Sequence, residues 1–334
     1  MKKLKLNWKD IIYILVGVLL LVMTIVTETK GLSDTDQDIY AKAMELQENV
    51  NGLGFTDFDV NKFKVRFFDG ESDYVVKGDE IVEEEPVIET FVGTTVEVDG
   101  EFQVLLPTYD RFSQMFTALA AAGNMAAGEF TFEEAEYSTN AHIATLWHEG
   151  FHTWQFQSGF DAINEQAMAA GLTEETSYAE VLLNEVDANE TLVTMFEQEM
   201  ELLDRIIDAE DKLPLLQELM VLRKERKAML STEAAFIERY YEAVEGSARY
   251  VEASIYHELE GQEAWEKTYM APFTYQNGSG KYYEMGMLKC MILDQIAPDW
   301  KESFCVTTDL DVLLAETLER IQNLIEKYNL TPPV

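Results

Sequence analysis

The chain has 334 residues, of which 47% are hydrophobic, so a sizeable buried core is expected rather than a disordered chain. Its formal net charge is −37 at pH 7. A surface this acidic repels the phosphate backbone of DNA and RNA, which excludes nucleic acid as a partner. The same excess of acid keeps the surface solvated and leaves some attraction for cations or basic substrates.

The N-terminus predicts a membrane anchor. Four lysines in residues 1–10 precede an apolar run from Ile11 to Val26, just short of the roughly 17–25 residues of a spanning helix. We therefore predict a cytoplasmic basic segment at residues 1–10, an uncleaved transmembrane signal-anchor at residues 11–27 and an extracytoplasmic domain at residues 31–334. A cleaved signal peptide is the alternative, but no Ala-x-Ala-like site follows the apolar run. The protein is thus expected to be a single-pass protein of the cell membrane.

The expected domain opens on closely spaced acidic residues. Asp34, Asp36 and Asp38 have the spacing of a calcium loop, but Ile39 stands where the sharp turn of such a loop needs glycine. The alternative, which we prefer, is an acidic N-terminal cap on a helix that runs to about Asn49 and stops at Asn51-Gly52.

Residues 63–107 predict β-strands, because apolar residues alternate with polar ones and Gly and Asp turns separate the runs. The expected strands are Phe63–Phe67, Tyr74–Val76, Val87–Val92 and Phe102–Leu106. From about residue 111 the pattern is helical, with two long helical stretches expected at about 175–209 and 214–260 and single helices at about 281–296 and 309–328. Strands followed by helices predict an α+β fold with an antiparallel strand-rich part at 60–110 and a helical part at 111–334.

The pentad His148-Glu149-Gly150-Phe151-His152 is the strongest functional signal of the chain. It lies on a helix expected from about Asn140 to Gln157 and ended by Gly159. The two histidines share one face of that helix and can bind one tetrahedral Zn²⁺ as neutral imidazoles. Glu149 can take a proton from a water that the metal activates. Gly150 is costly inside a helix, which indicates close packing beside the metal.

A catalytic zinc needs a third protein ligand. His142 and His257 lack the right spacing, so we expect them in the core or on the surface. Two glutamates are better candidates. Glu245 precedes small residues that would let its helix approach the pentad helix closely, and Glu185 is the rival.

Three short motifs resemble known metallopeptidases. The run from Glu245 to Tyr250, Glu-Gly-Ser-Ala-Arg-Tyr, resembles the third-ligand motif of gluzincin metallopeptidases, particularly of the membrane-alanyl-aminopeptidase-like superfamily. The resemblance implies that Glu245 completes the zinc shell of His148 and His152. Asn184-Glu185 resembles instead the Asn-Glu pair of thermolysin-like enzymes, which keeps Glu185 open as a ligand or as a residue that orients a histidine.

Tyr283-Glu284-Met285-Gly286 is similar to the Tyr-Glu-x-Gly element of the same superfamily. This resemblance implies that the Tyr283 hydroxyl stabilises the oxyanion of the transition state. The superfamily's Gly-x-Met-Glu-Asn motif has its nearest counterpart at Gly123–Gly128, which lacks the acid, so aminopeptidase specificity is not implied. Compared with the typical pattern, the segment between His152 and Glu245 carries an insertion at about 175–240, which suggests a lid or wall over the cleft.

The sequence therefore predicts a membrane-anchored, extracytoplasmic zinc metallopeptidase that acts on a peptide or protein substrate. His148, His152 and Glu245 are its expected metal ligands, and Glu149 and Tyr283 its catalytic residues. Arg249 is expected either to fix the Glu245 carboxylate or a substrate carboxylate, or to be exposed. The alternatives are an inactive metal-binding surface protein that binds a partner, and a zinc hydrolase of a non-peptide substrate whose cleft lacks an edge strand for an extended peptide.

The two cysteines, Cys290 and Cys305, leave two possibilities open. They could pair as a disulfide outside the cell. Each could instead be a small buried apolar residue.

Overall fold

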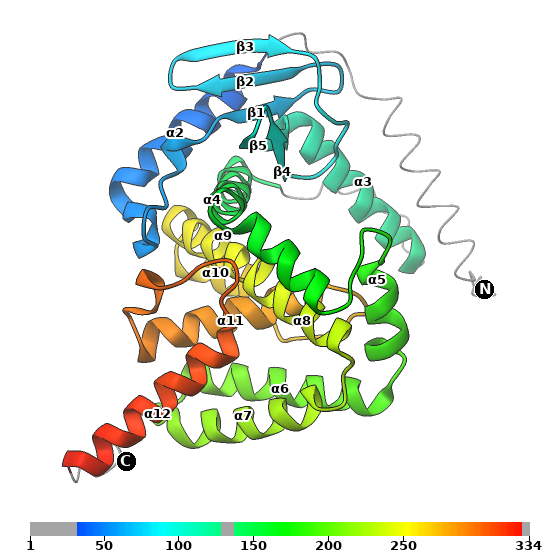
Figure 1. Cartoon of the computed structure of the whole chain (residues 1–334). Coiled ribbons are helices and arrows are strands. Elements are labelled where there is room, and N and C mark those ends of the chain that lie inside the picture. The colour runs from blue at the N-terminus through cyan, green and yellow to red at the C-terminus, as the bar shows by residue number, and fades with distance from the viewer. Residues whose placement is uncertain (1–31, 128–136, 329–334) are drawn as a thin grey trace. The chain divides into compact units, whose positions relative to one another are not determined.

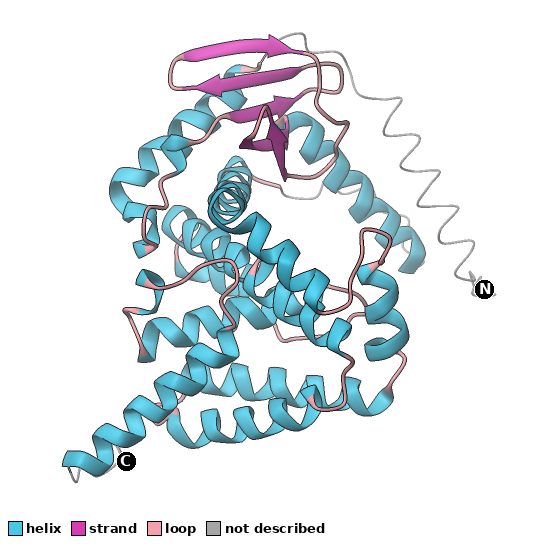
Figure 2. Ribbon diagram, viewed as in Figure 1, coloured by secondary structure: helices cyan, strands magenta, loops and turns pink. Residues whose placement is uncertain are grey.

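The computed structural model of the chain describes residues 32–127 and 137–328. The predicted signal-anchor at 11–27 lies outside these ranges, and within them no helix combines the length and apolar character needed to cross a membrane. Among the described residues the chain divides into two compact units, one formed by residues 32–50, 59–127 and 137–153 and the other by residues 51–58 and 154–328. Figure 2 shows strands and helices in an α+β fold, as predicted.

A five-stranded sheet lies in the first unit, with the strand order β3-β2-β1-β5-β4 (Figure 1). Its strands are β1 Val65–Phe68, β2 Asp73–Lys77, β3 Glu80–Glu84, β4 Thr94–Val98 and β5 Glu101–Pro107. β1 pairs with β5 in parallel, whereas the other neighbours pair antiparallel. The prediction of an antiparallel strand region therefore holds for three of the four strand pairs and is wrong for β1 with β5. β1, β2 and β3 form consecutive antiparallel hairpins and β4 and β5 form another, as local alternation suggests, and the two groups join through one parallel pair of distant strands.

The predicted strand at Val87–Val92 is also wrong, because this segment is a loop. Val87 and Val92 are exposed, and the backbone N–H of Val87 donates to the Asp73 carboxylate at 3.0 Å instead of to a neighbouring strand. The chain forms β3 and β4 on either side of this loop. β4 carries the Thr and Val alternation that is typical of a strand.

Helix α2, Asp34–Val50, begins at Ser33, whose hydroxyl accepts a hydrogen bond from the backbone N–H of Asp36 at 3.1 Å. The three acidic residues of the possible calcium loop are therefore helical, and that alternative is wrong. The buried Asp36 carboxylate instead accepts from the backbone N–H of Tyr109 at 2.7 Å. The helix ends as predicted, because Asn51 and Gly52 both adopt positive φ angles.

The core of the first unit lies between the sheet and its helices, which are α2, α3 Tyr109–Ala127 and the first part of α4 Thr139–Ala169. Val65, Phe67, Val104 and Leu106 of the central strands are fully buried. Trp147 of α4 is also fully buried, and its indole N–H donates to the Ala43 carbonyl of α2 at 3.1 Å. This bond fixes the pentad segment of α4 within the core of the unit.

The second unit is helical. Its elements are the second part of α4, α5 Tyr178–Val181, the π-helix η3 Leu182–Asp187, α6 Glu190–Asp208, α7 Leu213–Lys227, α8 Thr232–Ala243, α9 Glu245–Glu260, α10 Gln262–Tyr269, α11 Gly280–Ile296 and α12 Leu310–Tyr328, with short 3-10 turns at Asn51–Gly54 and Trp300–Glu302. A further 3-10 turn, Val60–Lys62, lies in the first unit. The predicted helices at 281–296 and 309–328 are confirmed. The stretches predicted as helical at 175–209 and 214–260 are helical for most of their length, and each is divided into shorter helices by new helix starts, two of them capped by Asn189 and Ser231.

Helix α4 continues beyond its predicted end at Gly159. A Cβ at Gly159 would lie 2.3 Å from Cγ1 of Val306. The glycine therefore serves close packing between α4 and the segment before α12, and it does not stop the helix.

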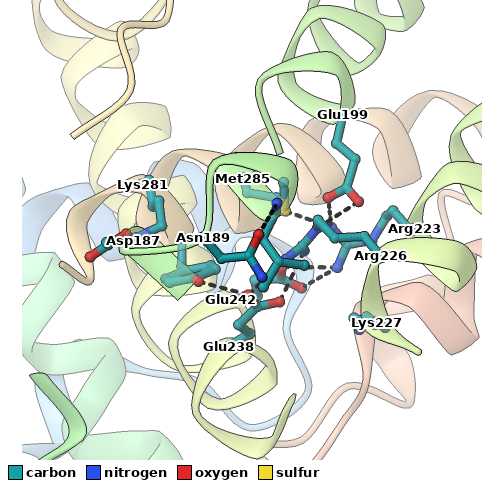
Figure 3. A network of polar contacts seen from close by, with 12 residues as sticks. Asp187, Asn189, Glu199, Arg223, Arg226, Lys227, Glu238, Glu242, Lys281 and Met285 are labelled. Carbon is teal, nitrogen blue, oxygen red and sulfur yellow. Dashed lines mark hydrogen bonds and ion pairs between the residues drawn. The ribbon is translucent and has the colours of Figure 1, made fainter. Parts of the chain in front are cut away.

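A buried ionic network packs the helices of the second unit together (Figure 3). It joins four cations to four carboxylates, namely Arg223, Arg226, Lys227 and Lys289 with Glu199, Glu238, Glu242 and Asp311. Burial disfavours a charged Glu242, but Arg223 and Lys289 outweigh it and hold the pKa of that carboxyl below its usual value. Removing one partner of such a buried pair costs roughly 3–5 kcal/mol. The network therefore fixes the end of α8, three residues before Glu245.

The two cysteines do not form a disulfide. Cys290 is buried in α11 and Cys305 is exposed, and both are free thiols. Cys290 is thus a small buried residue, which was one of the two expectations. Cys305 is neither paired in a disulfide nor buried, so both expectations are wrong for it.

Candidate metal centre

The two histidines of the pentad face each other on α4. His148 and His152 are both buried, and their Nε2 atoms lie 3.0 Å apart. Two nitrogens that each bind one tetrahedral zinc at about 2.0–2.1 Å lie about 3.3 Å apart. The observed separation is close to this value, so the pair has the geometry of two ligands directed at one ion.

Glu245 lies at the first position of α9 and is half-buried. The ligand atoms of His148, His152 and Glu245 all lie within 4.8 Å of one another, and among the described residues this is the one such group of three. Two imidazoles and one carboxylate are a ligand set of catalytic zinc that leaves the fourth position open. The residues present therefore fit Zn²⁺.

Helix α4 contacts the start of α9 within the second unit. One turn after His152, the Gln155 side chain donates to the Val244 carbonyl at 3.2 Å and to the Ser247 hydroxyl at 3.0 Å. Gln155 is fully buried. These bonds attach α4 to the residues on either side of Glu245.

Three residues considered as ligands lie elsewhere. His142 is a core residue whose Nδ1 lies 3.1 Å from the Tyr137 hydroxyl, and burial lowers the pKa of His142 to about 3. His257 is on the surface, where its Nε2 lies 2.9 Å from the Gln262 amide oxygen. Glu185 is exposed on the π-helix and does not belong to the cluster. The structure thus brings Glu245 to the histidines and leaves the rival Glu185 apart from them.

The edge strand β4 lies against the pentad. The Thr95 hydroxyl of β4 donates to the Glu149 carbonyl at 3.1 Å, and the Thr153 hydroxyl donates to the same carbonyl at 3.0 Å. Glu149 is buried, and a Cβ at Gly93 would lie only 2.7 Å from its Oε1 atom. The carboxylate of Glu149 therefore packs on the glycine that precedes β4.

Two glycines join α9 to α11. A Cβ at Gly246 would lie 2.5 Å from the Gly286 Cα, and a Cβ at Gly286 would lie 2.2 Å from the Glu242 carbonyl oxygen. The prediction that small residues bring α9 close to the pentad helix therefore holds for Ser247, which contacts Gln155, and is wrong for Gly246. The glycine contact places Tyr283, one turn before Gly286, beside Glu245.

The Tyr283 hydroxyl is hydrogen-bonded to Glu245. Burial, the Glu245 charge and this bond raise the pKa of Tyr283 well above its usual value, so the phenol stays protonated and able to donate. The Tyr241 ring stacks on the Tyr283 ring with centroids 6.1 Å apart. Burial and the Glu245 charge also raise the pKa values of Tyr240 and Tyr241. A group of protonated phenols thus surrounds the carboxylate.

Two further expectations about the site are wrong. Arg249 donates to Glu252 at 2.6 Å and stacks over the Tyr269 ring at 4.4 Å, so it does not fix Glu245. A Cβ at Gly150 would lie 3.1 Å from Cγ2 of Val60, so this glycine serves packing within the first unit and not contact with a metal.

Gly93, Thr95 and Gln155 were not among the residues predicted from the sequence. Gln155 had a detectable signal, since it is a polar residue on the apolar part of the pentad helix. Gly93 and Thr95 had none, because their role depends on how the sheet packs on α4. Comparison of the chain with protein-family models, with curated proteins and with solved structures found no match.

Proposed function

We propose that this chain is a zinc-dependent metallohydrolase that cleaves peptide bonds and has a zincin-like arrangement of the pentad helix and its sheet. The observation that most supports the proposal is the 3.0 Å separation of the His148 and His152 Nε2 atoms with the Glu245 carboxylate within 4.8 Å. Glu149, between the histidines, supplies a base for hydrolysis.

Each residue has a distinct role in the proposed reaction. His148, His152 and Glu245 would hold Zn²⁺, which when bound supplies Lewis acidity to a water and to the scissile carbonyl. The Glu149 carboxylate takes the proton of the attacking water and delivers it to the leaving amine. In the proposed reaction the Tyr283 hydroxyl, which has a single proton to donate, turns from Glu245 to the developing oxyanion, and this hydrogen bond is worth about 3–4 kcal/mol.

The edge strand β4 supports a peptide as the substrate. β4 lies at one end of the strand order, and Thr95 ties it to the Glu149 backbone. An extended peptide can pair with such an edge strand by main-chain hydrogen bonds. The non-peptide alternative expects a site without an edge strand, and the inactive alternative gives no reason for the buried Glu149 carboxylate between the two histidines.

We also propose that the domain is anchored in the cell membrane and faces outward. Support for this comes from the sequence of residues 1–30 alone, where lysines precede an apolar run. Protease treatment of intact cells tests it. Digestion of the domain without lysis is expected, and its full protection would contradict the proposed orientation.

The central experiment combines metal analysis with a peptide library. Full-length protein in detergent should contain one zinc per chain and cleave members of the library. Glu149→Gln should keep the zinc and lose the hydrolysis, because it removes the base but none of the ligands. Glu165→Gln is the matched control, since Glu165 is exposed on the same helix. Activity that survives in Glu149→Gln would remove the proposed base.

The ligand assignment has its own test. Glu245→Ala should lose zinc, whereas Glu185→Ala should keep it, because only Glu245 lies near the histidines. Zinc loss from Glu185→Ala alone would reverse the assignment.

A further inference from the structure

Asp187 makes several buried contacts that the proposed function does not use. It ends the π-helix η3, and its side chain is only 1% exposed. Its carboxylate accepts from the Tyr275 hydroxyl at 2.6 Å, from the Gly278 backbone N–H at 2.7 Å and from the Lys281 ammonium at 2.9 Å. One carboxylate thus binds three groups on the loop before α11 and on its first turn.

Lys281 strengthens this attachment. Its side chain is fully buried, and its ammonium also lies 4.7 Å from the Tyr282 ring centroid and 5.2 Å from the Tyr275 ring centroid. The Tyr282 hydroxyl in turn donates to Glu238 of the ionic network at 2.7 Å. Figure 3 shows Asp187 and Lys281 beside that network. The start of α11 is therefore fixed by buried polar contacts.

The first turn of α11 depends on these contacts, because it has no ordinary cap. Ser279 precedes the helix but makes no side-chain capping bond. Helix starts leave backbone N–H groups without intrahelical partners. The Asp187 contacts are not a cap of these N–H groups, but by accepting the Gly278 N–H and pairing with the Lys281 ammonium Asp187 attaches this uncapped turn to the π-helix.

The position of Tyr283 follows from this arrangement. It lies two residues after Lys281, and its hydroxyl bonds Glu245. A shift of the first turn of α11 would move this hydroxyl directly, since the side chain has few rotatable bonds. Ligand carboxylates are oriented by such neighbouring hydrogen bonds, and their loss typically weakens metal binding about tenfold to a hundredfold.

We propose that Asp187 is a positioning residue: by fixing the start of α11 it holds the Tyr283 hydroxyl on Glu245 and so orients the third metal ligand. This inference rests on the proposed function, because it assumes a metal at His148, His152 and Glu245. We expect Asp187 to act through Tyr283, and a loss of zinc affinity that depends on Tyr283 would distinguish it from a residue that only stabilises the fold.

A double-mutant cycle tests this role without relying on turnover. Zinc affinity of the full-length protein is measured by chelator competition for Asp187→Asn, Tyr283→Phe and the double variant. Each single variant should bind zinc about tenfold more weakly. The double variant should be no weaker than Tyr283→Phe, because both changes remove the same hydrogen bond.

The matched control lies at the other end of α11. Asp294 also accepts from a tyrosine, a tryptophan and a lysine, namely Tyr250, Trp300 and Lys301. It lies about 16 Å along the helix from Tyr283 at 1.5 Å per residue. Asp294→Asn should lower the melting temperature and leave zinc affinity unchanged. If library hydrolysis is available, Asp187→Asn should lower kcat and leave KM unchanged.

Several outcomes would overturn the inference. Additive losses in the double variant would show that Asp187 does not act through Tyr283, and an equal loss in Asp294→Asn would show general damage. If Asp187→Asn does not fold, Tyr275→Phe removes one of the three bonds to Asp187 and should weaken zinc binding in the same direction. Unchanged affinity in Tyr275→Phe would then count against the role. A wild-type chain that binds no zinc would overturn the proposed function as well.

Discussion

Replacing Gly286 by alanine tests the helix contact that joins the third ligand to the proposed oxyanion donor. The added Cβ would lie 2.2 Å from the Glu242 carbonyl oxygen and 2.7 Å from the Gly246 Cα. An unstrained contact needs about 3.5 Å, so α9 and α11 would have to separate by about 1 Å. Both obstructing atoms belong to the backbone, which has no rotamer that could move aside.

The expected cost follows from two opposing terms. Overpacking of a well-packed site costs about 1–3 kcal/mol, and the rigid backbone neighbours place this site at the upper end. Alanine gains up to about 1 kcal/mol over glycine inside a helix. Gly286→Ala should therefore destabilise the metal-free protein by about 2 kcal/mol. The same separation stretches the bond between Tyr283 and Glu245 beyond hydrogen-bond length, so zinc affinity should fall about tenfold.

Urea unfolding of the chelated protein measures the first effect, and chelator competition measures the second. Gly280→Ala is the matched control, because Gly280 lies on the same helix and a Cβ there would meet nothing within 4 Å. It should be neutral or slightly stabilising, with unchanged zinc affinity. If Gly286→Ala is as stable as Gly280→Ala, the close approach of α9 and α11 is refuted.

Two other predictions concern the base and the core. Gly93→Ala places a Cβ 2.7 Å from the Glu149 Oε1 atom. It should lower hydrolysis of the peptide library roughly tenfold to a hundredfold, while zinc content stays at one per chain. Full activity would show that the Glu149 carboxylate has room to move. His142 is buried in the folded protein, and burial lowers its pKa to about 3, whereas the pKa of the same histidine in the unfolded chain is about 6.5. Above pH 6.5 both states are neutral at His142, and as the pH falls toward 3 only the unfolded state gains the proton, which removes about 1.4 kcal/mol of stability per pH unit. Urea unfolding from pH 6.5 to 4.5 should thus show a steeper loss for the wild type than for His142→Phe, and parallel losses would contradict the buried neutral histidine.

The features predicted well from the sequence are local ones. The four-residue spacing of His148 and His152 correctly predicted that both lie on one face of a helix. Asn51-Gly52 correctly predicted where α2 ends. In each case the interactions that determine the helix or its end involve residues only a few positions apart, so a short segment of sequence is enough to predict them. The same holds for α11 and α12, whose apolar patterns are uninterrupted.

Predictions that needed distant partners failed. Gly159 has the composition of a helix stop, but Val306, far along the chain, determines its role. The parallel pairing of β1 with β5 joins strands separated by a hairpin and a loop, and nothing in either strand specifies its direction. The choice of Glu245 over Glu185 came from a motif resemblance, because both are acids on helices and the neighbours of a helix cannot be derived from its own sequence.

Some missed features left detectable signals. Ser231 and Asn189 are typical N-terminal caps, and each begins a new helix inside a stretch that was predicted as helical without internal boundaries. The Thr and Val alternation of Thr94–Val98 is a strand pattern that the longer apolar run at Val87–Val92 obscured. Greater weight on capping residues and less on apolar content would have placed these boundaries correctly.

The exposed thiol of Cys305 gives the protein a built-in attachment point. Partial burial raises the pKa of this thiol, but hydrogen bonds from Thr307 and Thr308 outweigh it and lower the pKa overall, so the thiol reacts readily with maleimides near neutral pH. Cys290 is buried, and burial raises the pKa of its thiol, which keeps it inert. The next residue, Val306, packs on Gly159 of α4. A fluorophore introduced there without any mutation would therefore report on movements of the helix that carries the two histidines.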